Sequence, residues 1–296
     1  MLRYLQLVFN FSGDFMSCVL SSNSISRKLL LSAALSVAHA SILAQAVELE
    51  FSVPAGLQSK IVEHASAAVP LRALAGYTSV EELDHKTNFS KIYIDSNVEL
   101  LRQESGLTGG SASTVYRNGA AKALGRGMNL CGLATVLSES QSTTDTSATS
   151  AIPIGKLFVP FGVKSSIDFS NRYRLSSLEA SIPSLCKPVA GEEFSFKFEA
   201  EHTMKTSGLF GGTKLIRRSA HSKCKVAAEA ISAKQVHPSL QGEALLVSCE
   251  SEDQNNKNST EEYVYLKDSA FYLLTGRVDE WQRSKIQYLA VPYAAP

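Results

Sequence analysis

The sequence lacks the motifs of several common function classes. It has no C-x-x-C pair, no G-x-S-x-G elbow and no G-K-[ST] loop, so zinc binding, α/β-hydrolase chemistry and P-loop phosphate binding have no motif to support them. It also lacks an excess of charge, because 29 basic and 28 acidic residues give a net charge of +1. Such a balanced chain gives no electrostatic reason to expect a nucleic acid partner. The sequence therefore predicts neither a cofactor nor nucleic acid binding.

A long hydrophobic run is missing at the N-terminus, where an apolar stretch covers residues 29–37. A bilayer-spanning helix needs about 20 apolar residues. The stretch follows Arg27 and Lys28 and precedes Ala44-Gln45-Ala46, which is the order of elements in a secretory signal peptide. We interpret residues 1–46 as a signal peptide, with residues 1–15 as an upstream extension. An uncleaved anchor is the alternative.

Cysteine is scarce, with five residues in the chain. Removal of residues 1–46 would take Cys18 away and leave an even number, namely Cys131, Cys186, Cys224 and Cys249. An even number of cysteines behind an export signal indicates disulfides and a periplasmic or secreted protein. Three pairings are possible. We favour Cys224–Cys249 and Cys131–Cys186, because the first pair ends two apolar, β-branched runs joined by a short connection.

The N-terminal part of the predicted mature chain, residues 47–137, reads as a mixed α/β region. Residues 47–53 alternate between apolar and polar side chains, which is typical of a strand. Residues 57–69 place apolar side chains on one helical face. Two segments, 79–82 and 95–99, carry the capping signal of a helix start. Residues 138–150 (SESQSTTDTSATS) then read as a Ser/Thr-rich linker.

The rest of the chain, residues 151–296, reads as antiparallel β structure. Residues 194–204 are its clearest strand, with Phe, Ala, His and Met on one face and mostly polar residues on the other. Hairpin signals follow at short intervals, which favours a sandwich or partial barrel. The expected fold class is therefore α+β, with a small mixed region before a larger antiparallel region. A Cys131–Cys186 bridge would cross the linker and argue for one continuous unit.

The strongest charge feature is the basic stretch that begins with Lys214, Arg217 and Arg218. Such a strand could bind an anionic envelope surface or a polysaccharide. A solvated sheet face beside the acidic loop at residues 250–262 is the simpler interpretation, because exposed ion pairs contribute little. That loop lacks the central glycine of a calcium loop and reads as a solvated hairpin turn.

Candidate catalytic residues are few. His202 ends an apolar strand face, where an imidazole could act as a base, but a buried structural histidine is the simpler interpretation. The aromatic face of Tyr263, Tyr265, Phe271 and Tyr272 could stack on carbohydrate, but it reads more simply as core. The sequence favours a non-catalytic envelope binding or scaffold module. A hydrolase acting on an envelope polymer, with a site assembled from scattered residues, is the alternative.

Overall fold

The computed structural model describes residue 53 and residues 55–66, 68–86, 91–102, 107–117, 121–154, 157–207 and 211–295. The predicted signal peptide, residues 1–46, and residues 47–52 of the first expected strand lie outside this part of the chain. The helix expected at residues 57–69 is confirmed as α1 (Ala55–Ser66).

Almost everything after α1 is strand, in hairpin after hairpin along the chain. The elements are β1 (Gly76–His85), β2 (Lys91–Arg102), β3 (Thr108–Tyr116), β4 (Ala121–Leu130), β5 (Ala134–Ile154), β6 (Leu157–Ala180), β7 (Glu193–Thr206), β8 (Gly212–Val226), β9 (Ile231–Ser232), the short 3-10 helix η1 (Ala233–Gln235), β10 (Glu243–Asp253), β11 (Asn258–Leu266), β12 (Phe271–Val278) and β13 (Gln282–Ala290). Each long strand pairs antiparallel with its neighbours, and β13 returns to pair with β1. In the described residues, twelve strands thus close into a barrel, with β9 as a short addition on β10.

The expected α+β class is wrong, because the region read as mixed α/β contains the first strands of the barrel. The capping signal at residues 79–82 lies within β1, and the one at residues 95–99 lies within β2. A capping box satisfies only the backbone donors of one helix end. Here β1 pairs along its length with both β2 and β13, and pairing of this extent overrides a local signal.

The alternating pattern of residues 194–204 is confirmed in β7. Phe194, Phe196, Ala200 and His202 are buried, while Lys197 and Glu199 on the opposite face are exposed. Residues at every second position share a face of a strand. The buried face therefore lines the inside of the barrel and the charged face forms its outer wall.

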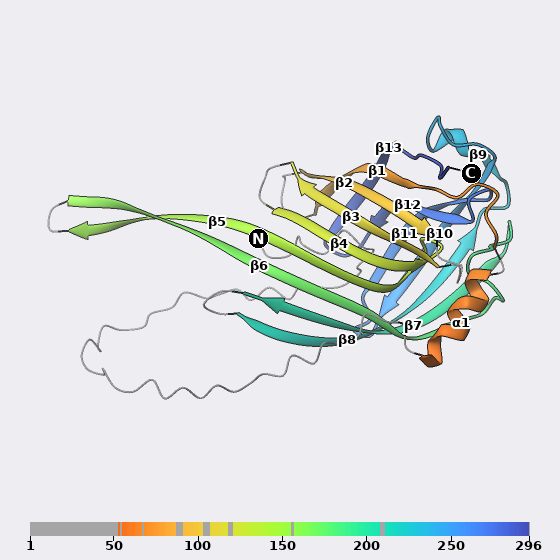
Figure 1. Ribbon diagram of the computed structural model, residues 1–296, viewed down its shortest axis with the longest axis horizontal. Coiled ribbons are helices and arrows are strands. Elements are labelled where there is room, and N and C mark those ends of the chain that lie inside the picture. Colours follow the sequence, from red (N-terminus) through yellow and green to blue (C-terminus); the bar gives the residue numbers. More distant parts are fainter. Residues whose placement is uncertain are drawn as a thin grey trace.

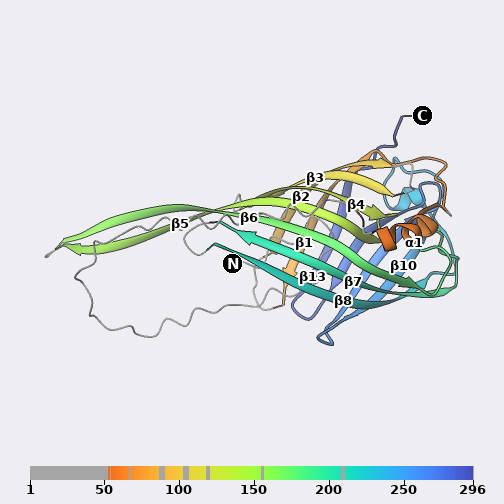
Figure 2. The same cartoon turned by 60° about the horizontal axis from the view of Figure 1, so that its bottom comes forward.

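The Ser/Thr-rich stretch at residues 138–150 lies within β5 and pairs residue by residue with β6. β4 accompanies β5 as far as Thr144, and β7 accompanies β6 as far as Phe169. Beyond these positions β5 and β6 continue together as a two-stranded ribbon, which projects from the barrel in Figures 1 and 2.

Both favoured cysteine pairs are present in the structure. Cys224 on β8 and Cys249 on β10 are direct cross-strand partners and form a disulfide. Cys131, in the turn after β4, is bonded to Cys186, in the connection between β6 and β7. This second bridge spans the Ser/Thr-rich stretch and ties its two flanks into one unit.

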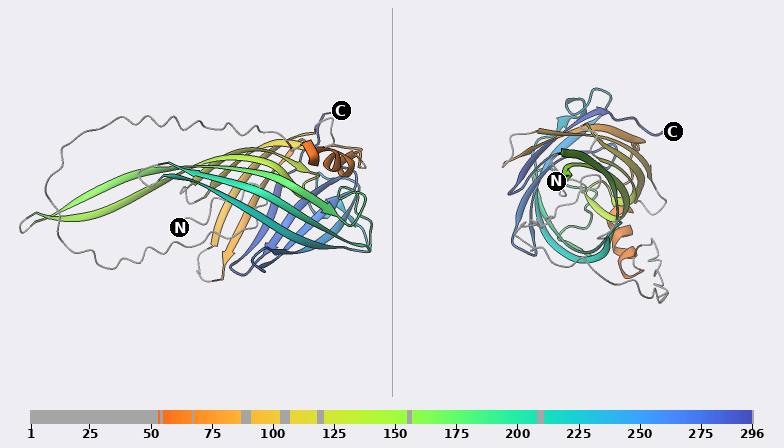
Figure 3. Two further views of the ribbon diagram at one scale, coloured as in Figure 1. Left: turned by 90° about the horizontal axis from the view of Figure 1, so that it is seen from below. Right: turned by 90° about the vertical axis from the view of Figure 1, so that its left-hand side faces the viewer.

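One end of the barrel is filled by the connection between β6 and β7. Leu185 and Cys186 are almost fully buried there. Their carbonyl oxygens accept hydrogen bonds from the hydroxyls of Tyr272 (2.9 Å) and Tyr265 (2.6 Å), respectively. Ser184 Oγ in turn donates to the carbonyl of His64 in α1 (2.7 Å), and Figure 3 shows α1 outside the ring of strands at this end. The connection therefore joins the helix to the barrel core.

The start of β12 divides the buried side chains into two clusters. Tyr272 N–H donates to the carbonyl of Cys131 (2.8 Å), so β12 reaches the turn between β4 and β5. Alternate residues of β11 and β12 face opposite clusters. One cluster contains the tyrosines of these strands, Tyr263, Tyr265 and Tyr272. The other contains their aliphatic neighbours, Val264, Leu266 and Leu273.

Replacement of Tyr272 by Phe tests the filling of this end. We expect Tyr272→Phe to lower the free energy of unfolding by about 1–3 kcal/mol, because the buried Leu185 carbonyl loses its donor. Urea unfolding measures this difference. Tyr93→Phe is the matched control, since Tyr93 lies on the outer wall and is 37% exposed. Equal unfolding midpoints for the two variants would show that the connection does not depend on this hydrogen bond.

Candidate functional site

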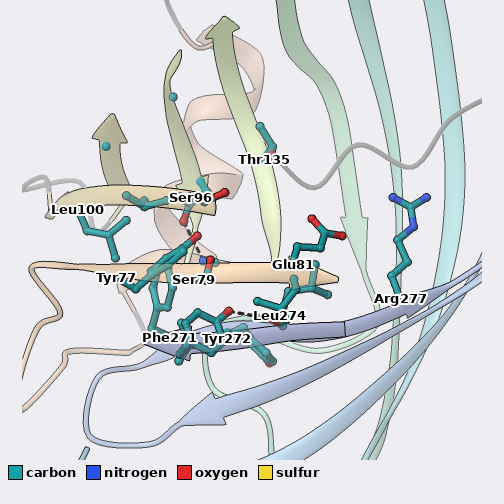
Figure 4. Close-up of a pocket in the computed structure, with 18 of the residues that line it drawn as sticks. Tyr77, Ser79, Glu81, Ser96, Leu100, Thr135, Phe271, Tyr272, Leu274 and Arg277 are labelled. Carbon is teal, nitrogen blue, oxygen red and sulfur yellow. Dashed lines mark hydrogen bonds between the residues drawn. The ribbon is translucent and has the colours of Figure 1, made fainter. Parts of the chain in front are cut away.

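A cavity of about 110 Å³ lies inside the barrel, between the wall formed by β1–β4 and the start of β12. Figure 4 shows the residues around it. Its lining combines polar and aromatic side chains from β1, β2, β12 and β13 with glycines from β3 and β4. The residues used below are Tyr77, Ser79, Glu81, Ser96, Gly110, Gly127, Phe271, Tyr272, Arg277, Ser284 and Tyr288.

The space exists because the β1–β4 wall carries small side chains. Gly110 on β3 and Gly127 on β4 are direct cross-strand partners, and both line the cavity. Ser79 on β1 and Ser96 on β2 are also partners and also line it. Barrels with more than eight strands have interiors wider than side chains alone fill, so small residues along one wall leave room for a ligand.

Glu81 is the central polar group of the cavity. It is 7% exposed, and its Oε1 has no hydrogen-bond partner among the described residues. Burial raises the pKa of Glu81 to about 7, while the Ser284 hydroxyl and the Arg277 charge oppose this shift. A buried carboxyl oxygen without a partner costs free energy, and a ligand that donates to this oxygen would recover it.

Arg277 is the second charged group of the lining and is 6% exposed. Its Nε lies 3.9 Å from Glu261 Oε1, and its Nη2 lies 4.0 Å from Asp279 Oδ2. Two carboxylates, one on β11 and one in the turn after β12, therefore balance the guanidinium charge. In Figure 4, Glu81 and Arg277 rise from neighbouring parts of the sheet toward the same side.

Aromatic rings form the rest of the wall. Tyr77 and Tyr288 meet edge to face, with ring centroids 5.3 Å apart, and the Tyr288 hydroxyl donates to the Leu274 carbonyl (2.8 Å). Burial raises the pKa of Tyr77 to about 12, so its hydroxyl stays protonated. These rings offer apolar edges next to the carboxyl group, a combination typical of small-molecule sites.

The basic stretch identified in the sequence is split between two faces of β8. Arg217 lies opposite Glu201 on the outer wall, with its Nε 3.5 Å from Glu201 Oε1. Lys214 and Arg218 lie opposite Met204 and Ala200, on the face that lines the barrel. The structure thus does not bring the three residues together on one surface.

Farther along the outer wall of β8, Lys223 lies opposite Glu250 on β10, and Lys225 lies opposite Ser248. Lys225 also lies 4.0 Å from Glu193 on β7. Glu250 on β10 and Glu193 on β7 therefore lie beside these two lysines, as expected for a solvated sheet face.

His202 lies inside the barrel and is 1% exposed. Burial, together with the smaller effect of the nearby Arg218 charge, lowers the pKa of His202 to about 4. Tyr173 on β6 is its direct cross-strand partner. The imidazole is therefore neutral at physiological pH and belongs to the core, as the simpler interpretation predicts.

The aromatic residues considered as a stacking platform are buried, and two of them, Phe271 and Tyr272, line the cavity. Tyr263, Tyr265, Phe271 and Tyr272 are at most 6% exposed, so they form no open stacking platform. His237 Nδ1 lies 2.7 Å from Ser239 Oγ, but its Nε2 is 3.2 Å from the Leu289 carbonyl, and the ring fixes an exposed turn to β13.

Two further features concern the described part of the chain. It holds no group of three or more His, Cys, Asp or Glu residues placed to bind a metal ion. None of its helices is long and apolar enough to cross a membrane.

Sequence reasoning missed Glu81 and Arg277. Glu81 was assigned to a capping box, although Tyr77, Ser79, Glu81 and Leu83 share one face of the strand, where apolar side chains flank the two polar ones. A carboxylate on the inward-facing side of a predicted strand is the signal that could have identified Glu81. Arg277 gives no comparable signal, because only the fold places β12 beside β1.

Comparisons with known proteins give no indication of function, so a functional proposal depends on the cavity residues described above. No family model, no curated protein and no solved structure matches the chain.

Proposed function

We propose that the protein is an exported, non-catalytic binding protein that holds a small molecule inside its barrel. The observation that carries the proposal is the buried Glu81 carboxyl, whose Oε1 has no partner among the described residues and borders an interior cavity. A cavity with a few polar groups set among aromatic side chains is the usual form of a small-molecule site.

The proposed location outside the cytoplasm is supported by the two disulfides, which form and persist in oxidising compartments. It is also supported by the sequence of residues 1–46, which has the order of a secretory signal. N-terminal sequencing of the mature protein tests this part of the proposal, and the expected first residue is Val47.

Ion pairs on the outer wall support a barrel whose outside faces water. Arg126 and Arg172 both bind Glu139, at 2.8 and 2.7 Å, and Arg117 binds Asp95 at 2.8 Å. Charged pairs of this kind are solvated at little cost in water. The ligand site is therefore expected inside the barrel rather than on its outer wall.

A lumen-blocking variant tests the binding function. Ser96 borders the cavity, and we expect Ser96→Phe to fill it and to abolish ligand binding. Asn97→Phe is the matched control, because Asn97 is the next residue on β2 and is exposed on the outer wall. The measurement is thermal unfolding of the mature protein with a set of small cationic, neutral and anionic compounds.

The expected result is that at least one compound raises the melting temperature of the wild type and of Asn97→Phe but not of Ser96→Phe. A ligand present at 100 times its Kd stabilises the folded state by about 2.7 kcal/mol, which such a scan resolves. If no compound distinguishes the wild type from Ser96→Phe, the binding function is wrong.

A further inference from the structure

The charges around the cavity narrow the class of ligand, an inference that rests on the binding function proposed above. We propose that the cavity binds a small protonated amine, whose ammonium group donates hydrogen bonds to the Glu81 carboxylate. The proposal depends on the unpartnered carboxyl oxygen, on the balance of nearby charges and on the aromatic wall.

The first observation is that Glu81 Oε1 can accept a hydrogen bond from a ligand. Glu81 is 7% exposed, and its Oε1 lacks a partner among the described residues. The groups that face it are Arg277 on β12 and Ser284 and Tyr288 on β13, and its partner on β2 is the apolar Ile94. A ligand nitrogen with several N–H donors can satisfy Oε1 and also reach a neighbouring hydroxyl.

The nearby charges favour a cation over an anion. Arg277 is within 4.0 Å of both Glu261 and Asp279, so its positive charge is already opposed by two carboxylates. The Tyr263 hydroxyl donates to Glu261 Oε2 (2.6 Å), so this carboxylate is held in place beside Arg277. With Glu81 ionised as well, three carboxylates face one guanidinium. These carboxylates would therefore repel an anionic ligand, whereas the positive charge of an ammonium group would offset the excess negative charge.

The wall also suits the carbon chain of an amine. Tyr77, Phe271, Tyr272 and Tyr288 line the cavity, and aromatic faces attract ammonium groups as well as alkyl chains. The cavity volume of about 110 Å³ is several times the roughly 10–15 Å³ that a single water molecule needs. The site therefore fits an amine with a short alkyl chain rather than a polymer.

Calorimetric titration with three probes of one shape tests the inference: n-butylamine, n-butanol and butyrate, each at pH 8. We expect n-butylamine to bind more tightly than the other two. Glu81→Gln should weaken its binding at least about tenfold, since a hydrogen bond to a charged group is lost. Glu82→Gln is the matched control, because Glu82 is the next residue on β1 and pairs with Lys91 on the outer wall.

The pH dependence gives a second readout. Butylamine has a pKa close to that of a lysine side chain, about 10.4, and stays protonated between pH 6 and 8. Glu81, with a pKa of about 7, is mostly ionised at pH 8 and mostly neutral at pH 6. The affinity for butylamine should therefore fall about tenfold from pH 8 to pH 6, and this dependence should vanish in Glu81→Gln.

The outcomes separate this inference from the binding function. If butanol or butyrate binds the wild type but not Ser96→Phe, while butylamine does not bind, the amine inference fails and the barrel remains a binding site. If none of the three probes binds, and no compound of the wider set distinguishes the wild type from Ser96→Phe, both proposals fail.

Discussion

Replacement of both Cys131 and Cys186 by Ala is expected to lower the free energy of unfolding by about 4 kcal/mol. The bridge joins residues 55 positions apart, and on the chain-entropy model a loop of that length gives a stabilisation of about 4 kcal/mol. The shorter Cys224–Cys249 loop, of 25 positions, should contribute about 3.5 kcal/mol on the same model. Urea unfolding of each double variant measures both values.

The Cys131–Cys186 bridge should have a further effect on the filled end of the barrel. Cys186 is held there by its disulfide and, through its carbonyl, by Tyr265. Loss of the bridge should therefore increase hydrogen exchange at residues 181–192 before it increases exchange in β7. The Cys224→Ala, Cys249→Ala protein, which retains the Cys131–Cys186 bridge, is the control and should keep the wild-type exchange at residues 181–192. Unchanged stability of the Cys131→Ala, Cys186→Ala protein would contradict this assignment.

Glu81→Gln is expected to stabilise the ligand-free protein at pH 8 by about 3 kcal/mol. Burial raises the pKa of Glu81 from 4.5 to about 7, and each pKa unit corresponds to about 1.4 kcal/mol. Since the folded state holds this proton more tightly, the contribution of Glu81 is fully present below about pH 4.5 and is lost as pH rises through about 7. Gln keeps the shape of the side chain and removes the charge.

The contribution of His202 to the free energy of unfolding has the opposite pH dependence. Its pKa is lowered from 6.5 to about 4, so its contribution is present above about pH 6.5 and is lost as pH falls toward 4. Between about pH 4.5 and 6.5 the two contributions oppose each other. The wild type should therefore show a shallow pH dependence in this range, whereas Glu81→Gln should gain stability steadily as pH rises.

Unfolding in urea at pH 4.5, 6 and 8 tests both slopes. The advantage of Glu81→Gln should be close to zero at pH 4.5 and should reach about 3 kcal/mol at pH 8. Glu82→Gln is the control: its exposed ion pair with Lys91 contributes little to stability, so this variant should stay close to the wild type at all three pH values. An advantage of Glu81→Gln that does not change with pH would show that its carboxyl group has an ordinary pKa.

The C-terminal strands could be predicted from the sequence because each carries its own evidence. In β7 the alternation of Phe194, Phe196 and Phe198 with polar residues indicates both the strand and its buried face. The disulfide partners could be favoured because Cys224 and Cys249 end two apolar runs. Signals of this kind are local, so they need no knowledge of the fold.

The closed barrel could not be predicted, because it depends on contacts between the two ends of the chain. Pairing of β1 with β13 joins Glu81 to Ile286 and Leu83 to Ser284, more than 200 positions apart by their residue numbers. The strands β3–β5 are also rich in Gly, Ser, Thr and Ala, of which Gly and Ala in particular give weak strand signals. Their small side chains have a different role: they leave the space that makes the cavity.

The state of the Glu81 carboxyl group tests the central claim most directly. A carbon-13 NMR titration of side-chain carboxyl groups, assigned by the signal missing in Glu81→Gln, follows it in the intact mature protein. We predict a midpoint near pH 7 that moves to lower pH when n-butylamine is added. A midpoint near pH 4.5, the ordinary value for glutamate, that does not change when the amine is added would contradict the claim that Glu81 is a buried, ligand-binding carboxyl group.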